Sequence, residues 1–215
     1  MPARQTWTLE ARRLRSRAWD RMQMPFDAKD DRSDEALLAL YAKGDRGAAH
    51  ALAGRFTPIA LRVAQRMLGD SAEAEDVAQE AMLRLWRVAP GWQPGAARVS
   101  TWLYRVVANL CTDRLRKRRW VPLDAAPEPE DGAPGVAERM IEADRAAALE
   151  GALSALPDRQ RQAVILRHLE GLSNPEIAEV MEVGVEAVES LVARGKRGLV
   201  AALSGRRAEL GYEHG

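Results

Sequence analysis

Apolar positions recur every three to four residues along most of this chain, which is the period of an amphipathic α-helix. Strict alternation of apolar and polar residues, which would indicate strands, is scarce, and Ala, Leu, Arg and Glu dominate the composition. The pattern therefore predicts an all-α fold. The predicted helices span 34–42, 48–68, 70–87, 100–120, 136–154, 158–169, 173–181 and 185–203.

Short polar residues stand where several of these helices should begin. Ser33 is a predicted N-cap, because its hydroxyl can accept a bond from a free amide of the first turn. Asp70 followed by Glu73, and Ser173 followed by Glu176, have the spacing of a capping box. These residues mark the starts of three predicted helices.

Proline and glycine mark the expected breaks. Pro58 is predicted to divide or kink the helix over 48–68, because it lacks an amide hydrogen and its ring crowds the preceding turn. Residues 89–99 are dense in Pro and Gly and are predicted to form a loop that leads into the helix at 100–120. Gly171 and Gly184 mark turns between the last three helices.

A proline-rich acidic stretch separates two helical parts of the chain. Residues 121–135 contain four acids and no base, and little in them can be buried, which is typical of a flexible linker. We therefore predict two helical domains joined by a flexible acidic linker. The expected parts are an extension over 1–32, a first domain over 33–120, the linker over 121–140, a second domain over 141–205 and a tail over 206–215.

The composition narrows the classes of protein. The chain has 215 residues, a net charge of +1, 47% hydrophobic residues and 29% charged residues, which is typical of a globular protein. No apolar run approaches the roughly 18 residues of a membrane span, and the chain's start lacks the apolar stretch of a secretory signal, so we expect no membrane insertion and a cytoplasmic protein. The one cysteine, Cys111, falls on the packing side of its helix, where a core role is expected.

The helix over 100–120 carries a concentrated positive charge. Residues 98–120 hold six arginines and one lysine against one acid, Asp113. Leu103, Val106, Val107 and Leu110 share one side of the helix, and Trp102, Arg105, Asn109, Thr112 and Arg116 lie opposite, with Lys117 beside them. A flat aromatic residue beside Arg and Asn suits stacking of an unpaired base and tracking of its backbone, so we predict a nucleic-acid surface. The alternative is an ordinary solvated helix face.

The helix over 70–87 has an acidic face that includes a leucine. Val77, Ala81 and Leu85 face one way, and Asp76, Gln79, Glu80, Leu83 and Arg87 face the other. This face is a candidate surface for binding another protein. The alternative is that Leu83 packs beneath a neighbouring helix.

The last two helices have the layout of a helix-turn-helix, in which a short helix, a turn with Gly184 and a longer basic helix follow one another. The pattern predicts a buried stripe of Val185, Val188, Val192 and Leu199. Glu186, Ser190, Arg194 and Arg197 are expected to point outward, where an arginine can bind guanine in the major groove. A plain helical hairpin is the alternative.

Nothing in the sequence predicts catalysis. His50, His168 and His214 are scattered, and no glycine-rich loop that could hold a phosphate is present. We therefore expect no catalytic residues, no cofactor and no metal site, and we disfavour a nucleic-acid enzyme.

Four stretches together resemble the bacterial sigma-70 family of transcription initiation factors, in its small extracytoplasmic-function (ECF) group. They are AEDVAQEAMLRLW at 74–86, STWLYRVVAN at 100–109, LPDRQRQAVILRHLEGLS at 156–173 and EIAEVM at 176–181. The likeness covers roughly residues 34–205. It implies that 33–120 form sigma region 2 and that 141–205 form sigma region 4, in a promoter-specificity subunit that takes part in transcription regulation such as a stress response.

The resemblance also implies roles for the surfaces. The helix over 70–87 would bind the clamp helices of core RNA polymerase; the residues concerned are Asp76, Gln79, Glu80, Leu83 and Trp86. The loop and helix over 91–118 would recognise the minus-ten element of promoter DNA and trap a flipped base, and the terminal helix-turn-helix would read the minus-thirty-five element. The linker would thread toward the RNA exit path. Members of the group are usually held inactive by an anti-sigma factor, which we expect here.

The start of the last helix departs from the family. The family commonly has GTVKSR there, whereas this chain places Ala187, Glu189 and Leu191 at the corresponding variable positions. Glu189 would repel phosphates or accept a bond from cytosine, so the minus-thirty-five contacts rest on Ser190, Arg194 and Arg197. A stand-alone helix-turn-helix regulator is the alternative function; it would account for 141–205 and leave the helix over 100–120 without a role.

Overall fold

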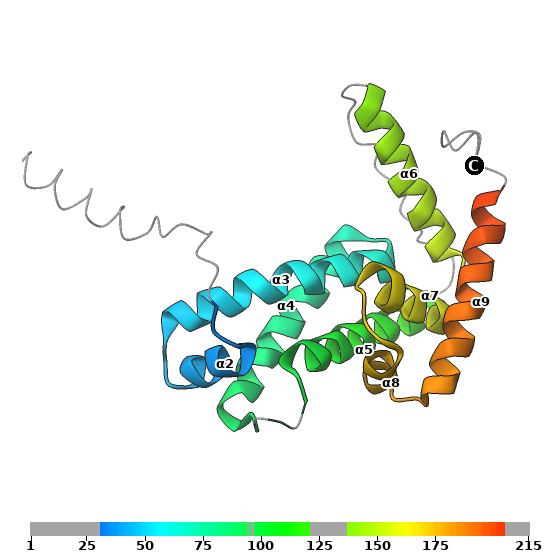
Figure 1. Ribbon diagram of the computed structural model, residues 1–215. Coiled ribbons are helices and arrows are strands. Elements are labelled where there is room, and N and C mark those ends of the chain that lie inside the picture. The colour runs from blue at the N-terminus through cyan, green and yellow to red at the C-terminus, as the bar shows by residue number, and fades with distance from the viewer. Residues whose placement is uncertain (1–30, 94, 96, 121–136, 205–215) are drawn as a thin grey trace, which may run out of the picture. The chain divides into compact units, whose positions relative to one another are not determined.

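The computed structural model describes residues 31–93, 95, 97–120 and 137–204, of which 119, 120 and 137–145 are described by their backbone alone (Figure 1). No strand occurs within these ranges, and the all-α prediction is confirmed. Most of the predicted extension, most of the linker and the whole tail lie outside the described residues. The helices are α2 (Asp34–Ala42), α3 (Arg46–Leu68), α4 (Ser71–Val88), α5 (Val99–Trp120), α6 (Ala137–Ser154), α7 (Asp158–Val164), α8 (Asn174–Met181) and α9 (Val185–Ser204), with a 3-10 turn η1 (Ala89–Gly91) and a π-helical turn η2 (Ile165–Leu169).

Helices α2, α4 and α5 pack around α3. We call residues 33–120 the region-2 half. The predicted N-caps are present: the Ser33 hydroxyl accepts a bond from the Ala36 amide at 3.2 Å, and Asp70 accepts one from the Glu73 amide at 2.9 Å. The predicted capping box at Asp70 is incomplete, because the Glu73 carboxylate accepts a bond from Arg118. An unpredicted cap, Asp45, begins α3 at Arg46, two residues earlier than expected. The largest fully buried side chains of this half are Phe56, Leu37, Leu38, Leu52, Met67, Leu85, Leu103 and Val63.

Pro58 does not divide α3, which runs unbroken from Arg46 to Leu68. The carbonyl that Pro58 leaves without a helical partner belongs to Gly54, and both residues lie on the exposed side of the helix. Water can therefore satisfy that carbonyl, and a solvent-side carbonyl can tilt outward without breaking the helix. Of the two predicted outcomes, a division or a kink, the division does not occur, because Pro58 lies on the exposed side of the helix.

Helices α6 to α9 form a second group, and we call residues 137–204 the region-4 half. α6 begins at Ala137, so the last four residues assigned to the linker are helical. The segment predicted as one helix over 158–169 ends as the turn η2, in which the Glu170 amide donates to the Ile165 carbonyl at 3.0 Å.

The helix-turn-helix is present. Ser173 and Glu176 form the predicted capping box at the start of α8. The predicted turn at Gly184 lies between α8 and α9, and the residue with a left-handed backbone in it is Glu182, with a φ of 53°.

The two halves contact each other directly, since α3 and α5 meet α7, η2 and α8 (Figure 1). By backbone contacts, the described residues from Ser33 onward cluster as one unit. Arg161 of α7 is buried between the halves: its guanidinium donates to the Met67 carbonyl of α3 and to the Ser154 carbonyl of α6, both at 2.6 Å. The sequence did not predict this contact.

Candidate nucleic-acid and polymerase interfaces

The polar side of α5 is largely open to solvent. Asn109, Thr112, Arg116 and Lys117 are exposed, whereas Leu103 and Val107 on the opposite side are buried. Thr112 donates its hydroxyl to the Ala108 carbonyl at 2.8 Å. Four predicted nucleic-acid residues therefore share one accessible surface of the helix.

Trp102 is half-buried and meets a second indole, Trp92, edge to face. The ring centroids lie 6.0 Å apart and the planes cross at 87°, which is a favoured aromatic geometry. The Nε1 of Trp92 is buried without a hydrogen-bond partner among the described residues. The sequence analysis assigned the loop that holds Trp92 to minus-ten recognition but did not single out Trp92; its only individual signal was an aromatic residue between prolines and glycines.

Two arginines of this surface are occupied by the region-4 half. The Arg105 guanidinium donates to the Glu179 carbonyl at 2.8 Å and lies 3.6 Å from the Glu182 carboxylate. Arg98, just before α5, pairs with Glu176 at 3.0 Å. The sequence assigned Arg105 to DNA, and the structure gives it protein partners.

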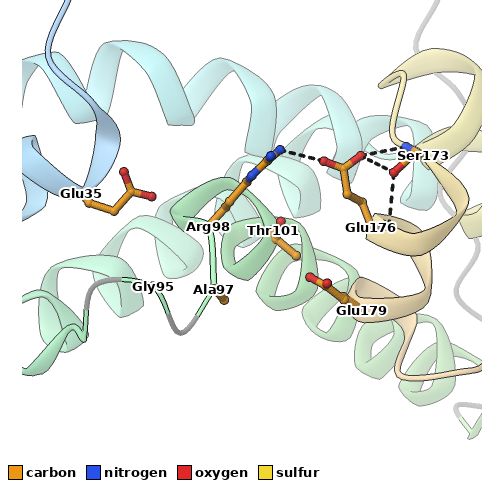
Figure 2. A pocket seen from close by; sticks show the side chains of 8 residues that line it. All are labelled: Glu35, Gly95, Ala97, Arg98, Thr101, Ser173, Glu176 and Glu179. Carbon is orange, nitrogen blue, oxygen red and sulfur yellow. Dashed lines mark hydrogen bonds and ion pairs between the residues drawn. The ribbon is translucent and has the colours of Figure 1, made fainter.

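A polar cavity of about 700 Å³ lies beside these contacts. Figure 2 shows Arg98 reaching across it to Glu176, which also holds Ser173 at the start of α8. The bonds from Ser173 lower the pKa of Glu176, so this carboxylate is ionised and available to Arg98. The lining residues are Glu35, Gly95, Ala97, Arg98, Thr101, Ser173, Glu176 and Glu179.

Glu170, directly after η2, is the most heavily bonded carboxylate between the halves. Its side chain is 1% exposed. Arg62 donates to both of its oxygens, at 2.9 and 2.6 Å, Arg66 donates at 2.8 Å and the Tyr104 hydroxyl at 3.2 Å. Bonding to Glu170 raises the pKa of Arg62, and burial, followed by the charge of Glu170, raises the pKa of Tyr104 to about 12. No sequence pattern pointed to this cluster.

The outward face of α4 matches the predicted protein-binding surface. Leu83 is 49% exposed, so it does not pack beneath a neighbouring helix. Gln79 is exposed, and Asp76 is exposed at 3.6 Å from Arg114 of α5. Glu80 is bonded by Arg84 at 2.9 Å, and this bond lowers the Glu80 pKa.

Trp86 lies at the edge of this face. It is half-buried against Tyr41 of α2, with ring centroids 4.4 Å apart, so only part of it is available to a partner.

On α9 the predicted outward residues Glu186, Ser190, Arg194 and Arg197 are all exposed. Of the predicted buried stripe, Val188 is fully buried and Val192 and Leu199 are half-buried. Val185, the first residue of α9, is 39% exposed, so the prediction was wrong there. Glu189 lies at the surface, 3.5 Å from the Asn174 amide.

Other candidate chemistry is limited. Cys111 is fully buried, as predicted, and burial raises its pKa to about 12, so it is a core thiol. Among residues 31–93, 95, 97–120 and 137–204, no group of three or more His, Cys, Asp or Glu side chains is arranged to hold a metal ion. In the same part of the chain, no helix combines the length and apolarity that a bilayer crossing requires.

Comparison with known families decides what this arrangement is. The profile of Sigma-70 region 2 matches residues 52–121, and that of Sigma-70, region 4 matches residues 146–199. Over 178 residues the chain is 38% identical to the ECF RNA polymerase sigma factor SigM of Mycobacterium tuberculosis, which covers 83% of this chain and 88% of that protein. This chain belongs to the sigma-70 family, ECF group.

Further similar proteins agree. The ECF sigma factor SigW of Bacillus subtilis is 32% identical over 170 residues, covering 73% of this chain and 89% of SigW. Among solved structures, CnrH in complex with the cytosolic domain of CnrY matches with a TM-score of 0.61 and 25% identity, over 81% of this chain and 99% of CnrH. The sigma factor RpoE of Bartonella quintana, solved with the anti-sigma factor NepR, shares the fold, with a TM-score of 0.53 and 20% identity over 69% of this chain and 92% of RpoE.

Membership of this family makes the chain a promoter-specificity subunit of bacterial RNA polymerase. It accounts for both helical halves at once, whereas the stand-alone regulator accounted for the region-4 half alone. The sigma-factor interpretation is therefore the one that the comparisons support.

Proposed function

We propose that three surfaces of this sigma factor divide the work of initiation. The outward face of α4 binds core polymerase, the polar side of α5 holds the separated minus-ten strand, and the outward side of α9 reads the minus-thirty-five duplex. The observation that carries the proposal is the polar side of α5, where an indole pair adjoins a row of exposed amide and cationic side chains.

The strand surface acts through stacking and charge. Opening duplex DNA costs about 1.4 kcal/mol per base-pair step in lost stacking. A base stacked on an aromatic side chain returns roughly 1–3 kcal/mol. Trp102 supplies the stacking surface, Asn109 can bond a base edge, and Thr112, Arg116 and Lys117 follow the strand's backbone. A few captured bases, together with polymerase contacts, therefore suffice to stabilise a small bubble.

The polymerase surface is the α4 face around Leu83. An exposed leucine beside Asp76, Gln79 and Glu80 offers apolar contact area surrounded by polar groups, which is the composition of many binding hot spots. Trp86 contributes its exposed edge. The duplex surface on α9 rests on Ser190, Arg194 and Arg197, with Glu189 at the surface to disfavour some sequences.

We further propose that this sigma factor is cytoplasmic, performs no catalysis itself and is controlled by an anti-sigma factor. The solved complexes of CnrH with CnrY and of RpoE with NepR support such a partner.

Transcription in vitro with core polymerase on a promoter library tests the proposal. Trp102→Ala should leave the affinity for core polymerase unchanged and reduce promoter opening, measured with permanganate, by about fivefold or more, the equivalent of roughly 1 kcal/mol of lost stacking. Opening at the wild-type level would refute the role of the α5 surface.

Leu83→Gln tests the polymerase surface separately. It should weaken co-purification with core polymerase, because it removes an exposed apolar contact without touching the core. Thr57→Gln, on the exposed side of α3, is the matched control and should bind core polymerase like the wild type. Equal binding by both variants would place the polymerase contact elsewhere.

A further inference from the structure

We propose that the free factor holds itself closed: the region-4 half covers part of the strand-binding surface of α5, and Glu170 locks it there. The proposal rests on the function proposed above, since it concerns when that surface becomes available to DNA. It assigns to Glu170, Arg62, Arg66 and Tyr104 a regulatory role distinct from binding DNA or polymerase.

The lock is a buried carboxylate with all of its described side-chain partners in the other half. Glu170 belongs to the region-4 half, whereas Arg62 and Arg66 of α3 and Tyr104 of α5 belong to the region-2 half. Arg62 binds it in the two-bond geometry that makes Arg–carboxylate pairs strong and directional. A carboxylate that is 1% exposed is tolerated only while paired, so these bonds and the closed arrangement depend on each other.

The closed arrangement uses arginines that DNA would need. Arg98 is paired with Glu176, and Arg105 is held by the Glu179 carbonyl and by Glu182. These partners lie in α8 and at its end, so the first helix of the helix-turn-helix lies beside the start of α5, across the polar cavity (Figure 2). These pairs use part of each guanidinium's donors and partly neutralise its charge, so each arginine attracts a phosphate less strongly than it would unpaired, although the Arg98 side chain is still 75% exposed.

The region-4 half does not satisfy all of the hydrogen-bond donors of Arg105. Its Nε–H is buried and has no hydrogen-bond partner among the described residues. An unpaired buried donor is costly, which disfavours the closed state slightly and leaves it able to open. DNA oxygens reaching Arg105 after opening would satisfy this donor.

The polymerase surface is not covered in the closed state. Leu83, Gln79 and Asp76 of α4 are exposed while Arg105 is occupied. Core polymerase can therefore bind the closed factor first, and the strand surface becomes available when the halves separate. Free factor would bind single strands weakly, because apparent affinity falls with the fraction of molecules in the competent state.

Glu170→Gln tests the lock, because it removes the charge with almost no change of shape and lies outside the strand surface. Glu150→Gln, an exposed change of the same kind on α6, is the matched control. The measurements are the radius of gyration by small-angle X-ray scattering, and the affinity for a fluorescein-labelled random single strand of about 20 nucleotides, a length that spans one strand-binding site. We expect the Glu170→Gln variant to have a larger radius of gyration and to bind the strand about tenfold more tightly. A tenfold gain corresponds to a wild type in which about nine in ten molecules are closed. Glu150→Gln should match the wild type.

Tyr104→Phe gives a second, milder test that removes one hydroxyl from the cluster and keeps the ring. It should increase the radius of gyration and the strand affinity by smaller amounts than Glu170→Gln. If circular dichroism shows that Glu170→Gln does not fold, Tyr104→Phe alone tests the lock. Wild-type size and affinity in the folded variants would overturn the lock.

The two proposals fail in different ways. An unchanged radius of gyration refutes the lock and leaves the strand surface to be judged by Trp102→Ala in the holoenzyme. Expansion without tighter strand binding refutes the strand surface itself. Adding Arg105→Ala to Glu170→Gln should abolish most of the gain in affinity, and a gain that persists would refute the masking of Arg105.

Discussion

Gly195 of α9 packs tightly against α7, and substituting it should destabilise the region-4 half. A Cβ atom at this position would lie 2.5 Å from Val164 Cγ2 and 3.0 Å from the Gln160 carbonyl oxygen. Carbon atoms in proteins rest about 3.5–4.0 Å apart, so Gly195→Ala forces α9 away from α7. The displaced helix carries Arg194 and Arg197.

The expected magnitude is a difference between two terms. Alanine is favoured over glycine inside a helix by about 1 kcal/mol. Overpacking a core costs about 1–3 kcal/mol. The upper part of that range applies, because the Gln160 carbonyl is backbone and cannot rotate away as a side chain would. We expect Gly195→Ala to lower the free energy of unfolding by about 1–2 kcal/mol after the helical gain is subtracted.

Gly54→Ala in α3 is the matched control. A Cβ atom there would meet nothing within 4 Å, so only the helical preference remains, and we expect a gain of about 0.5–1 kcal/mol. Urea unfolding followed by far-UV circular dichroism measures both variants. Opposite signs are the expected result. If Gly195→Ala were as stable as Gly54→Ala, the close approach of α9 to α7 would be wrong.

Local chemistry gives two further predictions. The pKa of Cys111 is raised to about 12, so its contribution to stability is present below the ordinary thiol value of 9.0 and is lost as the pH rises toward 12. Urea midpoints between about pH 8 and 11 should therefore fall less steeply in Cys111→Ala, whereas parallel curves would mean that the thiol is accessible in the folded protein. Ser173→Ala should cost about 1 kcal/mol by removing the cap of α8. The bonds between Ser173 and the Glu176 carboxylate lower the pKa of Glu176. Their contribution to stability is therefore present above the ordinary carboxyl value of 4.5 and is lost as the pH falls below it, so the wild-type advantage in urea midpoint should shrink in acid. An advantage that stays constant would refute the bond.

The sequence predicted the helices well because their signals are local. A cap needs one side chain and an amide three residues away, which is why Ser33, Asp70 and Ser173 were identified correctly. The exposure of Leu83 was left open, because a helical period gives the direction of a side chain but not whether another helix covers it. The division considered at Pro58 does not occur and Val185 is exposed, and both outcomes depend on which side of a helix is covered.

The contact between the halves was beyond the sequence because it joins residues about one hundred positions apart. Glu170 meets Arg62 and Arg66 across separations of 108 and 104 residues. Each of these residues, taken alone, has the pattern of an ordinary surface charge on a helix. Only the packing of η2 against α3 turns them into a buried cluster, and no period or motif encodes that packing.

The basic residues of α5 do not all serve one function. Their concentration predicted a polyanion surface, yet the arginines have different tasks in the folded chain. Arg118 bonds Asp70, Glu73 and the Leu68 carbonyl, and so ties the end of α5 to the turn between α3 and α4.

Arg105 is held by the region-4 half, and Lys117 is exposed with no ion pair among the described residues. The number of basic residues on α5 therefore overstates the cations that the free factor offers to DNA. The salt dependence of strand binding should report this difference. Each phosphate contact steepens the logarithmic salt slope by about 0.7 for single strands. Opening by Glu170→Gln would release Arg98 and Arg105 from their region-4 partners, and should increase both the salt slope and the affinity. Tighter binding with an unchanged slope would mean that opening adds stacking alone, and that the covered arginines do not reach the backbone.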